Sequence, residues 1–223
     1  MLEGGVCDFC WRGLPVSEDG RCGRCDEALP GAPDGAACGR CLVEPPPFES
    51  LRAAAPYRGS ARNILLAFKF DGADYLGPRM ADAMVRRLGM PAPPGLFEIA
   101  AVPATPRARR ARGYHPASVL AAALARRLSL PFVPGRLVKV RDTEVQSRVP
   151  AAGREANVRR AFEVQGAPPE GVLLVDDVAT SGATARECAR RLRAAGVRRV
   201  AVWCFARASR ADVGEVDALE VVA

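Results

Sequence analysis

Two adjacent carboxylates, followed by a run of small hydroxyl-bearing residues, are the clearest candidates for chemistry in this chain. Asp176 and Asp177 come directly after the apolar run Val172–Val175, which predicts a buried strand that ends at the acids. Small residues follow at 180–184, and the spacing of apolar residues after them predicts a helix. Backbone N–H groups at the start of a helix bind phosphate, and carboxylates accept hydrogen bonds from sugar hydroxyl groups. The segment therefore predicts a site for a phosphorylated sugar.

The small residues between the predicted strand and helix suit a phosphate group. Their backbone N–H groups and three side-chain hydroxyls can all donate hydrogen bonds. An ordinary turn between strand and helix is the alternative, but such a turn rarely joins a double acid to consecutive small residues. A Walker loop is excluded because no Gly-Lys-Ser/Thr stands at the right place. The candidate phosphate-binding residues are Thr180, Ser181, Gly182, Ala183 and Thr184.

A loop dense in arginine follows another predicted strand, Phe97–Val102. Ligands of open α/β sheets bind where the strands end at their carboxyl side, so this loop belongs to the same candidate site. Forked guanidinium groups can clamp a pyrophosphate through charge-assisted hydrogen bonds, and a solvated basic run is the alternative. The candidates are Arg107, Arg109, Arg110 and Arg112.

Six of the eight cysteines form three Cys-x-x-Cys pairs within the first 41 residues. In a reducing compartment this spacing indicates a metal site rather than a disulfide framework, and four thiolates complete a tetrahedral Zn²⁺ site. The segment is too short for an apolar core of its own, so the metal must hold it together. Three pairs do not divide evenly into four-ligand sites. The ligands are either Cys7, Cys10, Cys22 and Cys25, or Cys22, Cys25, Cys38 and Cys41.

After a proline run, Pro45–Pro47, the chain alternates helix with strand. This order predicts an α/β fold with a mainly parallel sheet covered by helices on both faces. We expect a small Cys-rich module over residues 1–47 and a larger domain over residues 48–223. The long polar stretch Lys139–Phe162 is predicted to be a functional lid. Helices are expected over 63–68, 74–88 and 115–128, short strands near 132 and over 137–140, a central strand over 200–205 and an edge strand over 219–222.

Composition narrows the class of protein and its compartment. Hydrophobic residues make up 49% of the chain and charged residues 26%, which is typical of a globular protein. No apolar run approaches the roughly 20 residues that span a bilayer, so no membrane insertion is expected. The N-terminus has neither a basic region nor an apolar core, which excludes a signal peptide and predicts a cytoplasmic location. The net charge of +7 suits anionic ligands and does not separate a phosphorylated sugar from nucleic acid.

The strand, the acids and the loop together resemble the signature of the phosphoribosyltransferases. That signature is four apolar residues, two acids and a T-(S/T)-G-(A/T)-T loop, and residues 172–184 fill it. The resemblance implies that Asp176 and Asp177 are the catalytic acids and hold the ribose hydroxyls of phosphoribosyl pyrophosphate (PRPP). It also implies that residues 180–184 wrap the 5′-phosphate.

Further motifs narrow the resemblance to the ComF-like proteins, which join a zinc ribbon to a type I phosphoribosyltransferase domain. The shared features are the Cys-x-x-Cys pairs, the PPPF junction, the R-x-R-R-x-R-G-Y loop, Lys69-Phe70, and an R-x-T-x-x-Q…R-x-x-N pattern in the lid. By this resemblance Lys69, Arg141 and Gln146 join the PRPP site.

Two departures from the ComF-like pattern stand out. These proteins usually carry four Cys-x-x-Cys pairs that bind two zinc ions, and the third pair is missing here. The family also tends to have Gly-Phe-Asn-Gln where this chain has Gly113-Tyr114-His115-Pro116. His115, the only histidine, is expected to cap a helix or lie on the surface rather than to catalyse.

The resemblance implies a phosphoribosyl transfer from Mg²⁺-bound PRPP to a small-molecule acceptor, expected to attack through nitrogen, with release of pyrophosphate. The rival is a non-catalytic factor of competence and DNA uptake, which binds single-stranded DNA or recombination and helicase partners, with PRPP as a regulatory ligand. Phe9 and Trp11, with Arg12, Arg21, Arg24 and Arg40 nearby, would then form a stacking and phosphate-binding surface for nucleic acid; the alternative is that Phe9 and Trp11 pack the module against the larger domain. The sequence identifies neither the acceptor nor the oligomeric state, for which a dimer is one option.

Overall fold

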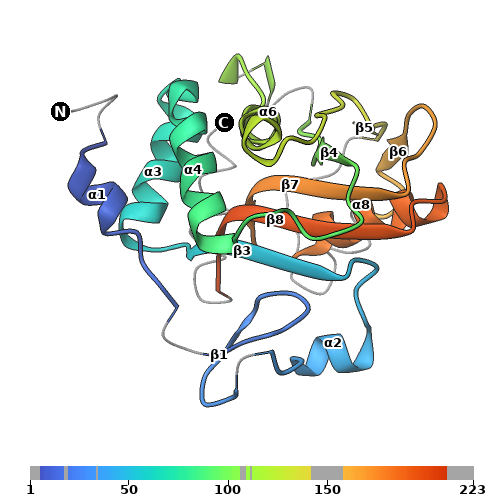
Figure 1. The fold of residues 1–223 in the computed structure, drawn as a ribbon, viewed down its shortest axis with the longest axis horizontal. Helices are drawn as coiled ribbons and strands as arrows, with labels where there is room; N and C mark the ends of the chain where they lie inside the picture. The colour runs from blue at the N-terminus through green and yellow to red at the C-terminus, as the bar shows by residue number, and fades with distance from the viewer. Residues whose placement is uncertain are drawn as a thin grey trace.

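A four-stranded parallel sheet forms the centre of the molecule (Figure 1). The structure is a computed structural model that describes residues 6–17, 20–33, 35–105, 109–110, 112–141 and 158–209. All three pairs of neighbouring strands run parallel, as the alternation of helix and strand predicted. The strand order is β3 (Ser50–Pro56), β8 (Arg199–Arg207), β7 (Gly171–Ala179) and β4 (Glu98–Ala101).

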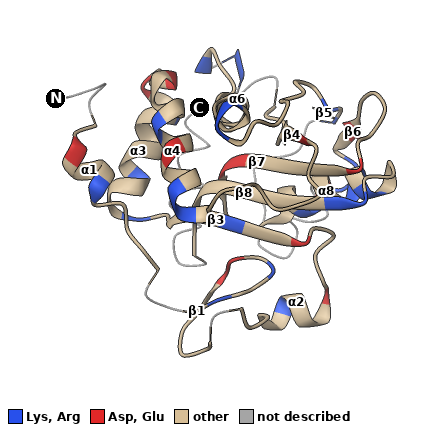
Figure 2. Cartoon of the chain, in the orientation of Figure 1, with Lys and Arg blue, Asp and Glu red and all other residues tan. Residues whose placement is uncertain are grey.

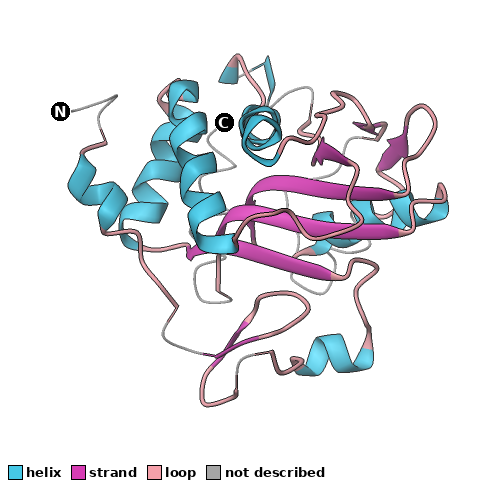
Figure 3. Cartoon of the chain, in the orientation of Figure 1, coloured by secondary structure: helices cyan, strands magenta, loops and turns pink. Residues whose placement is uncertain are grey.

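Helices cover both faces of this sheet (Figure 3). The buried apolar side chains form two clusters, because the side chains of a buried parallel strand point alternately to both faces. One cluster includes the apolar faces of α3, α4 and α6, and the other includes that of α8. The predicted fold class is therefore confirmed. The helices are α3 (Gly59–Phe70), α4 (Gly77–Leu88), α6 (Pro116–Leu128) and α8 (Ala183–Ala194), with a 3-10 turn, η1 (Asp74–Leu76), before α4.

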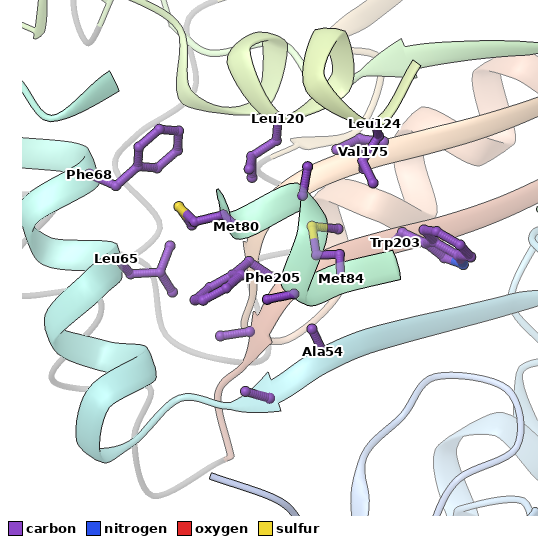
Figure 4. Packing of buried hydrophobic residues seen from close by; sticks show 14 of the residues in the cluster. Ala54, Leu65, Phe68, Met80, Met84, Leu120, Leu124, Val175, Trp203 and Phe205 are labelled. Carbon is purple, nitrogen blue, oxygen red and sulfur yellow. The ribbon is translucent and has the colours of Figure 1, made fainter. Parts of the chain in front are cut away.

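Large apolar side chains from α3, α4 and α6 pack against β7 and β8 (Figure 4). Phe68 and Met80 are completely buried against Phe205 and its neighbours in this cluster. A Cβ atom at Gly77 would lie only 2.4 Å from a methyl carbon of Val119, so glycine allows α4 to begin this close to α6. The packing fixes the end of α3, which carries a residue of the candidate site.

A short antiparallel pair joins the two ends of the predicted lid. β5 (Leu137–Lys139) pairs with β6 (Phe162–Val164). Phe132 forms an isolated bridge with Ile99 just before this pair, as its apolar character suggested. The interior of the lid, residues 142–157, and the predicted edge strand over 219–222 lie outside the described residues.

The N-terminal residues divide between two places. The short helix α1 (Asp8–Arg12) belongs with the main core, because Trp11 is 5% exposed among side chains of that cluster. The remaining elements, β1 (Gly20–Arg21), β2 (Ala28–Leu29) and α2 (Gly39–Val43), lie beside β3 (Figure 1). There the N–H of Leu51 donates to the carbonyl of Arg24 at 2.8 Å, and the N–H of Ala53 donates to Asp26 Oδ2 at 2.9 Å. The edge of the sheet is thus covered by the Cys-rich segment.

Within the described part of the chain, each helix is too short or too polar to cross a bilayer.

Candidate functional site

The acidic pair lies near the carboxyl end of β7, where Figure 2 shows it in red. The strand continues through both acids to Ala179, so the prediction that it ends at Val175 is wrong. The reason is pairing with β8, since Val178 and Ala179 are in register with Ala206 and Arg207.

Asp177 forms a buried ion pair with a residue of α3. Its Oδ2 lies 3.2 Å from Lys69 Nζ, and both side chains are at most 10% exposed. Its Oδ1 accepts the N–H of Val178 at 2.7 Å. Burial by itself would raise the pKa of Asp177, but attraction to Lys69 and Arg112 holds that pKa below its ordinary value. Asp177 is therefore a carboxylate at neutral pH, with Lys69 as its counter-ion.

Asp176 has the opposite electrostatic character. It is partly exposed at the residue level, and its Oδ1 accepts the N–H of Asp177 at 2.9 Å. Removal of its carboxyl from water and repulsion by Asp177 raise the pKa of Asp176 well above its ordinary value. Asp177 is thus a carboxylate that its neighbours stabilise. The charged form of Asp176, by contrast, would be stabilised by a cation or by hydrogen-bond donors of a bound ligand.

The small-residue loop leads directly from β7 into α8. Gly182 has φ 73°, in the left-handed region that favours glycine, and it precedes the first residue of the helix. Ser181 Oγ accepts the N–H of Ala183 at 3.3 Å. Thr180, Ser181, Gly182 and Thr184 are partly exposed, whereas Ala183 is buried. The loop and the positive end of a 12-residue helix together offer an anion site next to the acids.

The arginine loop contributes one side chain to the neighbourhood of Asp177. The guanidinium of Arg112 lies 5.2 Å from the ring centroid of Phe70, the residue after Lys69. Arg112 Nε and the hydroxyl of Tyr114 are buried without a hydrogen-bond partner among the described residues, so both can serve a ligand. Arg109 and Arg110 are exposed, and Arg107 lies outside the described residues.

His115 ties the arginine loop to the start of α6. Its Nε2 accepts the N–H of Ala104 at 3.0 Å, and its Nδ1 is hydrogen-bonded to Ser118 Oγ. Because Nε2 accepts, the neutral ring carries its proton on Nδ1. Burial lowers the pKa of His115. His115 thus stands at the cap position of α6, but its side chain makes no capping hydrogen bond to the backbone of the helix.

Of the two lid residues named by resemblance, Arg141 and Gln146, the structure describes only Arg141. Arg141 stands at the base of the lid, where its Nη2 donates to the carbonyl of Arg159 at 2.7 Å. Gln146 lies outside the described residues.

Four cysteines come together in the N-terminal segment, and they are the second of the two predicted groupings. The sulfur atoms of Cys22, Cys25, Cys38 and Cys41 all lie within 4.8 Å of one another. The structure does not form the first grouping, because Cys7 and Cys10 are a separate pair at the start of α1, with their sulfur atoms 3.6 Å apart. The sequence does not show that α1 packs on the main core through Trp11, and this packing separates Cys7 and Cys10 from the other cysteines.

The geometry of this four-cysteine cluster fits a tetrahedral zinc ion. At a Zn–S distance of about 2.3 Å, ligand sulfurs lie about 3.8 Å apart, and Cys25 and Cys38 are 3.6 Å apart. The N–H of Cys38 donates to Cys22 Sγ at 3.3 Å, a contact typical of thiolate ligands.

Three arginines join the cysteine cluster to the small-residue loop, a role that sequence reasoning missed: it placed Arg40 on a candidate nucleic-acid surface and did not single out Arg186 or Arg207. Arg40 and Arg207 donate to carbonyl oxygens of the loop and of the strand end, and Arg186 donates to Cys41. No pattern in the sequence distinguishes them from the many exposed arginines. Only the docking of the N-terminal segment on α8 and β8 brings these contacts about.

Comparisons with known proteins show what this chain is similar to. A family model described as Phosphoribosyl transferase domain matches residues 116–222. The DNA utilization protein YhgH of Salmonella typhi is 29% identical, over 91% of this chain and 97% of that protein. Competence protein F of Haemophilus influenzae is 26% identical, over 91% of this chain and 96% of that protein. A crystal structure of adenine phosphoribosyltransferase shares 14% identity over 69% of this chain and 79% of that chain, with a TM-score of 0.38.

The family match begins at the first residue of α6 and includes β7, the acids and the loop. Each of the two relatives aligns with 91% of the chain, so the similarity extends well beyond residues 116–222 and includes at least part of the N-terminal segment. The resemblance inferred from the motifs is thereby confirmed: this chain is similar to ComF-like proteins over 91% of its length and contains a type I phosphoribosyltransferase domain.

Proposed function

We propose that the protein binds Mg²⁺-PRPP and transfers the phosphoribosyl group to a nitrogen of a small-molecule acceptor. One observation carries the proposal: the acidic pair, the small-residue loop and the Lys69–Asp177 ion pair meet at the carboxyl end of one parallel strand. Such strand ends are where open α/β sheets bind ligands. The match of residues 116–222 to the phosphoribosyl transferase domain supports the same reading.

Each part of the site has a role in this reaction. Residues 180–184 hold the 5′-phosphate through backbone N–H groups and hydroxyls. Asp176 and Asp177 accept hydrogen bonds from the ribose hydroxyls and favour positive charge that develops at C1. Arg112, with Arg107, Arg109 and Arg110, binds the pyrophosphate, and Arg141 and Gln146 join the PRPP site as the resemblance implies.

The bond changes follow from the ligand. The C1–O bond to pyrophosphate breaks with both electrons on the oxygen, and the acceptor nitrogen forms the new C1–N bond and then loses a proton to solvent. Mg²⁺, when bound, neutralises charge on the leaving pyrophosphate. The Asp176 carboxylate is a hard oxygen ligand of the kind that Mg²⁺ prefers, directly or through water.

Isothermal calorimetry with PRPP, with and without Mg²⁺, tests the binding step. Asp177→Asn removes a charged acceptor and should weaken Mg²⁺-PRPP binding by roughly 1.5–3 kcal/mol. Asp82→Asn, which alters a half-exposed pair with Arg127, is the matched control and should leave the affinity unchanged. A wild-type protein that does not bind PRPP at millimolar concentration rejects the proposal. A screen of nucleobases and amines for pyrophosphate release then tests turnover.

A second candidate is a non-catalytic role in DNA uptake, in which the protein binds single-stranded DNA and PRPP acts as a regulatory ligand. The names of the two relatives, DNA utilization protein and competence protein, favour it. So does Phe9, which is 84% exposed on α1 beside the exposed Arg12 and offers a ring for base stacking. Trp11, by contrast, is buried in the main core, as the packing alternative expected.

Single-stranded DNA binding by the full chain, measured with and without Mg²⁺-PRPP, separates the two candidates. Under the second candidate the affinity should fall steeply with salt, and both Phe9→Ala and Arg12→Ala should weaken it. Val16→Ala, another exposed apolar position, is the control. PRPP binding without pyrophosphate release from any acceptor, together with DNA binding through Phe9, would replace the enzymatic proposal by the second one.

A further inference from the structure

The four-cysteine cluster docks against the back of the small-residue loop. Arg40, the residue before Cys41, donates from Nη1 to the carbonyl oxygen of Ser181 at 2.9 Å. Arg207, at the end of β8, donates from Nη1 to the carbonyl of Ala179 at 3.1 Å and from Nη2 to Glu27 Oε2 at 2.6 Å. The two carbonyls on either side of Thr180 are thus both held by arginines that belong to, or are paired with, the cysteine-rich segment.

A third arginine connects the helix that follows the loop to a metal-ligand candidate. Arg186 is 2% exposed and lies in the first turn of α8, where its N–H donates to the carbonyl of Gly182 at 2.9 Å. Its Nη2 donates to Cys41 Sγ at 3.5 Å, and its Nη1 donates to the carbonyl of Glu44 at 3.2 Å. The start of α8 is therefore anchored on the sulfur cluster itself.

Charge explains why arginines make these contacts. Four thiolates around one Zn²⁺ carry a net charge of about −2, and hydrogen bonds from outside the ligand set stabilise such sites. The guanidinium groups of Arg40 and Arg186 supply compensating positive charge. A guanidinium bonds more strongly to a metal-bound thiolate than to a neutral thiol, so metal binding should tighten the contact with Arg186.

We propose that Arg40, Arg186 and Arg207 are positioning residues that couple metal occupancy of the four-cysteine cluster to the conformation of the loop at 180–184. Metal binding orders the loop, and the loop in turn holds a phosphate group more tightly. The second half of this statement rests on the proposed PRPP function, and the first half does not. Thermodynamic linkage requires the effect to be reciprocal, so PRPP must increase the zinc affinity by the same factor.

Hydrogen exchange of the full chain, followed by mass spectrometry, tests the first half without any reaction. Peptides covering 180–186 should exchange more slowly in the zinc-loaded protein than in the metal-free protein. Arg40→Ala should remove much of this protection with zinc still bound, and Arg24→Ala should not, because the Arg24 guanidinium donates to the carbonyl of Cys41 instead. The Arg40 variant is decisive, because it tests the contact even if the metal-free segment unfolds. Equal exchange of the loop in the loaded wild type and in loaded Arg40→Ala overturns the proposal.

Two titrations test the second half. PRPP should bind roughly tenfold more tightly to zinc-loaded protein, and competition with a chromophoric chelator should show the same factor for zinc when PRPP is present. Arg40→Ala should bring both factors close to one, and Arg24→Ala should leave them near the wild-type value. Unequal or absent factors in a wild type that binds PRPP refute the coupling. Zinc-dependent loop protection in a protein that never binds PRPP would instead reject the proposed function and leave the positioning role standing.

Discussion

The Lys69–Asp177 pair makes a quantitative prediction about stability. Lys69→Met keeps most of the apolar volume of the side chain and leaves the Asp177 carboxylate buried without its nearest counter-ion. Loss of one partner from a buried pair costs about 3–5 kcal/mol. Arg112 still attracts the carboxylate, which places the expected loss at the lower end, about 3 kcal/mol. For a chain of this length that corresponds to a fall in Tm of roughly 6–12 °C.

Urea denaturation at neutral pH measures the loss in the free energy of unfolding. Two further variants test whether the loss comes from the unpaired charge. Lys69→Met/Asp177→Asn should recover more than half of the lost free energy of unfolding, because no unpaired charge remains. Arg127→Met breaks a half-exposed pair with Asp82 and should cost less than about 1 kcal/mol. A Lys69→Met protein within 0.5 kcal/mol of wild type, on the scale of surface changes, would refute the assignment of a buried charge pair.

The ion pair also predicts how the stability difference between wild type and Lys69→Met changes with pH. The folded-state pKa of Asp177 is depressed, so its contribution to stability is present above the ordinary value of 3.8 and is lost as the pH falls through the folded-state pKa. In Lys69→Met the pKa of Asp177 rises, because the nearest positive charge is gone. The difference in stability between wild type and Lys69→Met should therefore narrow as the pH is lowered towards about 4. A gap that widens on acidification contradicts this account.

Three further predictions concern other parts of the molecule. Gly182→Ala should cost about 1–2 kcal/mol in urea unfolding, because residue 182 has a positive φ, and should also weaken PRPP binding; an unchanged protein would show that the loop adopts another conformation. Metal analysis should find one tightly bound zinc, lost in Cys41→Ser and kept in Cys7→Ser; the reverse pattern would restore the first predicted grouping. Burial lowers the pKa of His115, so unfolding experiments should show stability falling as the pH drops below the ordinary value of 6.5, less so in His115→Gln; identical pH profiles would contradict this.

The sequence was sufficient for the parts of the fold that depend on continuous apolar runs and helical spacing. β8 and the helices over 59–70, 77–88 and 116–128 lie close to their predicted positions. β3 was not predicted, because its three alanines and one arginine show neither an apolar run nor a clear alternation. Its conformation depends instead on pairing with β8 and on the cover that the cysteine-rich segment provides.

The candidate site was predictable in composition but not in its contacts. The acids and the loop follow from a local pattern, whereas the Lys69–Asp177 pair joins residues 108 positions apart. The resemblance named Lys69 as a site residue but did not predict its pairing with Asp177. The choice between cysteine groupings depended on where α1 packs, which spacing along the chain does not encode. The contacts of Arg40 and Arg186 were missed for a similar reason, since their partners lie more than 140 positions away.

The cysteine-rich segment that covers the edge of β3 affects whether two copies of the protein can pair through their sheets. The carbonyl of Arg24 and the carboxylate of Asp26 occupy N–H groups on the outer side of β3, which would otherwise be open to any extended segment. The same strand edge in a molecule that has lost this cover could accept a strand from a second copy, and the sheet would then grow from one molecule into the next. The cysteine-rich segment thus protects the edge of the sheet from pairing with other molecules. Protein prepared without metal is expected to aggregate before its central fold is lost.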